Sequence, residues 1–167
     1  MSLLTYEEAR PWAKAIRDEV TSRRMPPWGA VAGIGDFADD PSLSTPEIDL
    51  LVAWVEGGAP EGDPVYLPHR MPAIVGESGK TSLPVHTREL KVATSAYLPS
   101  AATLMGIRPG GAGEAWAVLP DSSVRRLIRI EDYRKKWART YVLRNPESFP
   151  AGTQIHAEGA AFTLFLR

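Results

Sequence analysis

Met25 is the residue of this 167-residue chain whose surroundings point most directly to chemistry. It stands in the run Arg24-Met25-Pro26-Pro27-Trp28, after a stretch with helical spacing. A methionine thioether is a soft metal ligand, and the two prolines restrict the backbone that would carry it. The alternative is a methionine packed into a small core beside Trp12, Trp28 and Trp54. Met25 is therefore a candidate ligand, and the tryptophans are candidates for the wall of a pocket or of a core.

The other residue types that bind metals lack a ligand spacing. The chain has no cysteine, so it cannot form a disulfide or a thioether-linked cofactor by itself. Of its three histidines, His69 and His86 lie in or just after a Pro-rich stretch, and His156 is expected to face outward from a strand. The acidic, Gly-rich loop at 29–41 lacks the spacing of a calcium-binding loop. No metal site is expected beyond Met25.

Helical patterns fill the first part of the chain and would position Met25. Residues 5–8, Thr-Tyr-Glu-Glu, match a capping box. Pro11 falls inside the helical pattern that follows and predicts a kink or a restart, and the helix is expected to end before Pro26. Residues 44–47, Ser-Thr-Pro-Glu, form a second capping box, which opens a helix that ends at Gly57.

The later part of the chain has β-strand patterns. Prolines and glycines between 59 and 82 indicate a linker. Short apolar or alternating runs, separated by turn residues such as Asn145-Pro146, predict an antiparallel β-sandwich, and the imperfect alternation in one of them predicts a bulge. The runs lie at 89–98, 103–108, 114–119, 124–130, 140–143, 153–157 and 161–166. The fold class is therefore α+β, with a helical segment at 1–58, a linker at 59–82 and a β-sandwich at 83–167.

Several motifs of the helical segment are shared with a known family. They are Ser2-Leu3-Leu4-Thr5-Tyr6-Glu7-Glu8-Ala9-Arg10-Pro11-Trp12, the Met25 run, and Leu43-Ser44-Thr45-Pro46-Glu47 followed by Trp54-Val55-Glu56-Gly57-Gly58-Ala59-Pro60. They resemble the part of a bacterial c-type cytochrome domain that follows its Cys-x-x-Cys-His motif. The resemblance covers residues 2–64 and implies Met25 as an axial haem ligand, with Trp28 and Trp54 in the pocket wall. The resemblance implies that this segment is a small cytochrome c-like remnant without the haem attachment site.

The sandwich region carries a fainter resemblance, over residues 83–158. Leu104-Met105-Gly106-Ile107-Arg108, Ala115–Asp121, Tyr133–Tyr141 and Phe149–Ile155 are similar to the C-terminal domain of copper type II ascorbate-dependent monooxygenases. In that family the first motif reads His-Met-His-Leu-Arg, and its two imidazoles bind copper. Leu104 and Gly106 occupy those positions here. The resemblance therefore supports the sandwich fold and argues against monooxygenase activity.

Three functions remain open at this stage. The resemblance favours a fragment of an exported or periplasmic haem c electron-transfer protein, without catalysis or covalent haem of its own and with an unknown redox partner. A non-catalytic binding or assembly module is the first alternative, and a degenerate copper monooxygenase is the second. The net charge of −1 gives no reason to expect nucleic acid as a partner, and neither a signal peptide nor a membrane span is apparent. The helical part is expected to pack on the sandwich or on a second copy of the chain, because its apolar side chains need cover.

Overall fold

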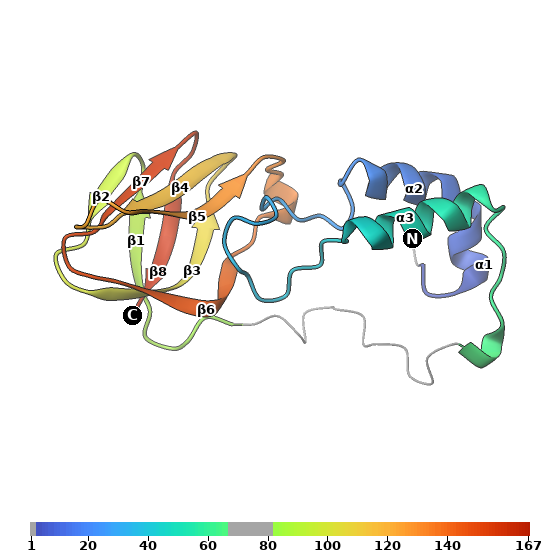
Figure 1. Ribbon diagram of the computed structural model, residues 1–167, viewed down its shortest axis with the longest axis horizontal. Helices are drawn as coiled ribbons and strands as arrows, with labels where there is room; N and C mark the ends of the chain where they lie inside the picture. Colours follow the sequence, from blue (N-terminus) through green and yellow to red (C-terminus); the bar gives the residue numbers. More distant parts are fainter. Residues whose placement is uncertain (1–2, 67–81) are drawn as a thin grey trace. The chain divides into compact units, whose positions relative to one another are not determined.

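The chain folds into two compact units, which are described here separately. The computed structural model describes residues 3–66 and 82–167 (Figure 1). The helical unit comprises residues 1–28 and 41–79, and the sandwich unit comprises residues 29–40 and 80–167. The chain therefore leaves the helical unit after Trp28, contributes twelve residues to the sandwich unit, and returns at Pro41.

The helical unit begins with a helix that is interrupted at Pro11. Thr5 caps α1 (Tyr6–Ala9) by accepting a bond from the Glu8 amide at 3.3 Å. A single turn of 3₁₀ helix, η1 (Arg10–Trp12), follows and contains Pro11. The helix then continues as α2 (Ala13–Thr21). This restart confirms the prediction, because proline cannot donate to the preceding turn.

The second long helix has the predicted start and end. In α3 (Thr45–Glu56), the Ser44 side chain caps the backbone while the Glu47 carboxylate accepts from the Ser44 amide at 2.8 Å. These bonds from Ser44 hold the pKa of the Glu47 carboxyl below its usual value. Gly57 closes the helix, and the short 3₁₀ helix η2 (Pro64–Tyr66) follows. Most of the expected linker lies outside the described residues.

The helical unit buries little of its apolar surface. In its described residues, the fully buried apolar side chains are Ala13, Val20 and Ala59, none larger than valine. No residue of α3 is fully buried, and Leu50 on this helix is 71% exposed. Other large apolar side chains are also well exposed, namely Leu3, Leu4, Trp12, Met25, Val65 and Tyr66.

The sandwich unit consists of two four-stranded antiparallel sheets, which confirms the predicted α+β fold with a β-sandwich. The strands are β1 (Arg88–Val92), β2 (Ser95–Tyr97), β3 (Ala102–Pro109), β4 (Gly113–Val118), β5 (Val124–Ile130), β6 (Tyr141–Phe149), β7 (Gln154–Glu158) and β8 (Phe162–Leu166). The sheet orders are β1-β8-β3-β6 and β2-β7-β4-β5. A 3₁₀ turn, η4 (Lys135–Trp137), lies between β5 and β6. The single run expected at 89–98 is two strands in different sheets.

Two irregularities of strand pairing explain features of the sequence. Ala115 of β4 pairs with Ile128, and Trp116 with Arg126, so Leu127 is an extra residue on β5. This is the predicted bulge, and it lets Leu127 and Ile128 both face the core. On β6, Val142 pairs with Gly106 and Glu147 with Leu104. The residues between them, Asn145-Pro146 included, form an irregularity within one strand, whereas the sequence pattern had placed a turn there.

Residues 29–40, here called the edge segment, pair with one outer strand of each sheet. Ala30 forms a bridge to Ile130 on β5, and Phe37 forms one to Leu143 on β6. Bonds of 2.9 Å run from the Val31 amide to the Arg129 carbonyl and from the Ala38 amide to the Val142 carbonyl. The expected boundaries group residues 29–40 with the helices, whereas the structure groups them with the sandwich.

The edge segment also contributes to the hydrophobic core of the sandwich. Phe37 is buried and packs edge-on against the Tyr141 ring, with 5.4 Å between ring centres. The Tyr141 hydroxyl accepts a bond from the Gly29 amide at 3.3 Å, and burial raises the pKa of this phenol. Gly35 has φ +76°, and a Cβ there would collide with the Phe37 ring and lie 2.6 Å from the Leu127 carbonyl oxygen. Glycine is therefore required at this approach.

Candidate functional site

Met25 lies on an exposed loop just beyond the end of α2. Its backbone amide donates to the Glu19 carbonyl at 3.3 Å, which ties the loop to the last turns of the helix. The neighbouring Arg24 guanidinium binds the Glu19 carboxylate through two bonds of 2.9 and 3.0 Å. The Met25 residue is 43% exposed. It is therefore held by its backbone and presents much of its side chain outward, instead of filling a core.

The tryptophans of the helical unit are covered to different extents. Trp54 on α3 is partly exposed and donates from Nε1 to the Pro60 carbonyl at 2.9 Å, which fixes the chain after the helix. Trp28 is also partly exposed, and Trp12 is 48% exposed. The sequence singled out Met25, Trp28 and Trp54 as ligand and wall. In this unit all three keep accessible apolar surface.

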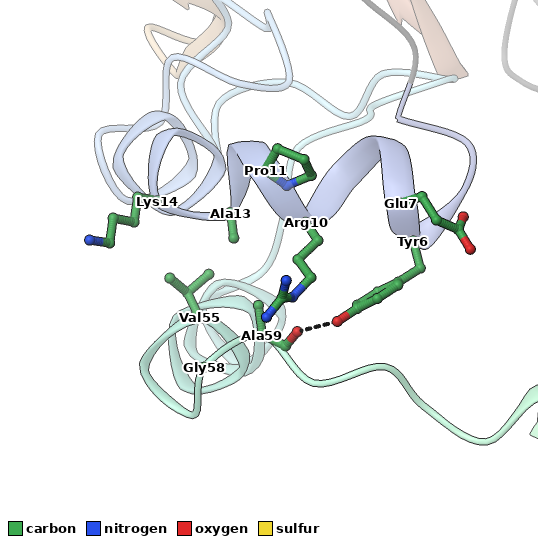
Figure 2. Close-up of a pocket in the computed structure, with 9 residues that line it drawn as sticks. All are labelled: Tyr6, Glu7, Arg10, Pro11, Ala13, Lys14, Val55, Gly58 and Ala59. Atoms are coloured by element: carbon green, nitrogen blue, oxygen red, sulfur yellow. Dashed lines mark hydrogen bonds between the residues drawn. The ribbon is translucent and has the colours of Figure 1, made fainter.

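A hollow of about 680 Å³ lies elsewhere in the helical unit, where the first helical turns approach the end of α3. The Tyr6 hydroxyl donates to the Ala59 carbonyl at 2.9 Å beside this hollow, and the bond is drawn in Figure 2. The hollow is mostly apolar, with Arg10 and Lys14 among its lining residues. Met25, Trp28 and Trp54 are not among those residues, so the hollow and the candidate ligand are separate features.

The two positions that bind copper in the resembled monooxygenases are occupied here by Leu104 and Gly106, which have no metal-binding side chain. Leu104 is fully buried on β3. A Cβ at Gly106 would lie 2.8 Å from the Leu83 side chain and 3.0 Å from the Tyr141 carbonyl oxygen. An imidazole at position 106 would therefore require the surrounding residues to move. The described residues contain no group of three or more His, Asp or Glu side chains that could hold a metal ion.

The histidines and the acidic loop do not converge on one site. His69 lies outside the described residues, and His86 and His156 both belong to the sandwich unit. His156 faces outward beside the buried Ile155, as the alternation predicted. In the edge segment, the Asp36 carboxylate lies 3.5 Å from Arg144 and accepts from the Asn145 amide at 3.2 Å. Asp36 therefore anchors the segment to β6.

One cluster of surface side chains was missed at the level of sequence. Trp116 on β4 faces outward between Ala115 and Ala117, which are both fully buried. Its indole ring stacks on the His156 ring, with 5.4 Å between ring centres and 12° between planes. The alternation of Ala115, Trp116 and Ala117 is visible in the sequence, and in a strand it places the tryptophan on the face opposite to the two alanines.

Comparisons with known proteins do not assign a family. No family model, curated protein or solved structure matches this chain. Among the residues that the structure describes, no helix has both the length and the apolar character needed to span a membrane.

Proposed function

We propose that this chain is part of an exported haem c electron-transfer protein, in which the helical unit supplies the methionine ligand and one wall of the haem crevice. The observation that carries the proposal is the uncovered apolar surface of this unit. It buries nothing larger than Val20 among its described residues, while Trp12, Met25 and Leu50 are 43–71% exposed. A group of large apolar area would stabilise such a surface when it binds.

The residues present fit one half of a haem site. Met25 offers a thioether from a loop whose backbone is fixed to α2, and Trp28 and Trp54 offer apolar wall. The chain has no cysteine, and the described part of the helical unit has no histidine. The attachment motif and the second axial ligand would therefore be supplied from outside the described residues, as the resemblance implies for a segment upstream.

Each residue has a defined task in this proposal. Haem c, when bound, supplies one-electron transfer. The Met25 thioether would be the residue that holds the haem iron, and a methionine ligand would favour a high reduction potential. The Trp28 and Trp54 side chains would exclude water from the haem, which also affects the reduction potential. The redox partner is a protein that remains to be identified, and no catalytic residue is proposed.

The proposal is tested by adding the missing half as a haem c peptide that carries Cys-x-x-Cys-His and has an open axial position. Titration into the intact chain is expected to produce the red-end absorption band of thioether-ligated ferric haem. Met25→Ala should abolish this band, whereas Met105→Ala on β3 should leave it unchanged. If the band is absent, or if it survives in Met25→Ala, the proposal is wrong.

The two alternatives differ in their support. A degenerate copper monooxygenase has no support from positions 104 and 106, where neither Leu104 nor Gly106 carries a donor side chain. A sandwich that acts as a binding module has a specific observation in its favour, the outward aromatic cluster at Trp116.

A further inference from the structure

We infer that the outer face of the sheet β2-β7-β4-β5 binds a neutral oligosaccharide. The inference begins with an inverted size pattern on β4, where Ala115 and Ala117 fill the core positions and Trp116 stands outside. Burial of a tryptophan would stabilise the fold far more than burial of an alanine. The packing of the core therefore does not explain why the Trp116 indole faces outward. The indole makes its contacts on the surface of the sheet, where a ligand could also reach it.

The strand registers place further aromatic and polar side chains on the same face. Trp116 pairs with His156 on β7, which pairs with Ser95 on β2. In the next row, Val118 pairs with Gln154, which pairs with Tyr97. Tyr97 is 60% exposed. Two rows of the sheet thus combine three aromatic side chains, Tyr97, Trp116 and His156, with the polar Ser95 and Gln154 and the apolar Val118.

The distribution of charge on this face favours an uncharged ligand. The Arg126 guanidinium is bound to the Glu114 carboxylate at 2.6 Å, and Arg129 to Glu131 at 2.9 Å. Among the described side chains of the two rows, Ser95, Tyr97 and Gln154 make no hydrogen bond through their polar groups. The hydrogen-bonding side chains of these rows are therefore the neutral hydroxyl and amide groups of Ser95, Tyr97 and Gln154, together with the His156 imidazole that stacks on Trp116.

Neutral donors and acceptors beside aromatic rings suit the chemistry of a sugar. A pyranose offers a C–H face for an aromatic ring and hydroxyl groups for amide and hydroxyl side chains. Tyr97 and Trp116 lie two strands apart, which is about 10 Å across a sheet. Such a separation suits a chain of sugar units more than a single ring. This inference does not depend on the proposed haem function.

The test is a titration of the intact protein with cello-, xylo-, malto- and N-acetylchitohexaose, and with a polyanionic polysaccharide for comparison, followed by calorimetry and by tryptophan fluorescence. At least one hexaose is expected to bind, with an affinity that does not change with salt, since no charge is neutralised. Trp116→Ala and Tyr97→Ala should each weaken binding about tenfold or more, equivalent to about 1.4 kcal/mol. Trp137→Ala is the matched control, because Trp137 is an exposed tryptophan on η4, away from the two rows.

Three outcomes would overturn the inference. The first is the absence of binding by every hexaose to protein whose thermal unfolding shows that it is folded. The second is binding of an acidic polymer only, lost on Arg126→Gln or at high salt, which would indicate an anion surface. The third is an equal loss of binding in Trp116→Ala and Trp137→Ala. Tyr97→Phe refines the result, because it keeps the ring and removes only the hydroxyl.

Discussion

The sandwich unit and the helical unit differ most in what they bury. The sandwich encloses large side chains such as Phe149, Phe162 and Leu164, which are at most 2% exposed. In the helical unit, the described residues that are buried are two alanines and a valine. Each buried Å² of apolar surface contributes roughly 25 cal/mol. The sandwich therefore has a core of its own, whereas the helices bury few of their described apolar side chains against one another.

The expectation that a partner surface covers the helices follows from the same difference. The candidates are the sandwich, a second copy of the chain, or the haem with its attachment segment. The haem peptide titration addresses the third candidate, and the oligomeric state in solution addresses the second.

The largest expected effect tests whether the edge segment belongs to the well-packed unit. Phe37→Ala should lower the free energy of unfolding of the sandwich by about 3–5 kcal/mol, the usual cost of removing a buried phenylalanine. Chemical denaturation followed by far-UV circular dichroism measures it, with Trp12→Ala, a large exposed aromatic residue, as the control. A loss below about 1 kcal/mol would contradict the assignment of residues 29–40 to the core of the sandwich unit.

Gly35→Ala tests the same segment through its backbone. The variant should destabilise the sandwich by about 1–3 kcal/mol, because alanine is strained at φ +76° and its Cβ would collide with Phe37. Gly33→Ala is the matched control, since Gly33 has φ +82° but has open space around its Cβ position. Equal losses of unfolding free energy in the two variants would mean that backbone strain alone destabilises them. The close packing around Gly35 would then make no contribution.

A smaller effect is expected from pH at the surface of the sandwich. The hydrogen bond from Arg126 holds the pKa of Glu114 below its usual value. The unfolded chain then binds a proton more readily than the folded one, so this stabilisation is present above about pH 4.3 and is lost as the pH falls through the lowered pKa. Thermal unfolding between neutral and acid pH should show a smaller decrease for Glu114→Gln than for the parent. Equal decreases would contradict the assignment.

The smallest effect is expected in the helical unit. Leu50→Ala should change the free energy of unfolding by less than about 0.5 kcal/mol, because the side chain is 71% exposed and leaves no cavity. A loss of several kcal/mol in dilute solution, measured by denaturation followed by circular dichroism, would show that Leu50 is covered by another surface. A loss that grows with protein concentration would identify that surface as a second copy.

Local rules predicted much of the fold from the sequence. The restart at Pro11, the cap at Ser44 and the bulge in β5 each depend on residues within a few positions of one another. The edge segment was not predicted, because its partners lie more than a hundred residues away in the chain, as in the bond from Gly29 to Tyr141. Its glycines also interrupt any alternation that would mark a strand.

The candidate sites show the same limit. Met25 and the tryptophans were found through residue type and resemblance, yet their exposure depends on packing that no local pattern contains. Pro146 looked like a turn because proline cannot donate to a sheet, but an irregular stretch of β6 does not require that donor. Trp116 could have been found, since the alternation with alanine was visible, but which face is buried depends on the opposite sheet.

The path of the chain through the edge segment restricts how the gene for this protein could recombine with other genes. Residues 29–40 lie between α2 and α3 in sequence and pair with β5 and β6 in space. A gene fusion that transferred only residues 80–167 would leave β5 and β6 without the edge segment that pairs with them, and unpaired edge strands are templates for aggregation. A fusion that transferred only residues 1–79 would carry Phe37 without its core. A recombination event that keeps both units intact would therefore have to transfer the helical unit and the sandwich unit as one continuous gene segment.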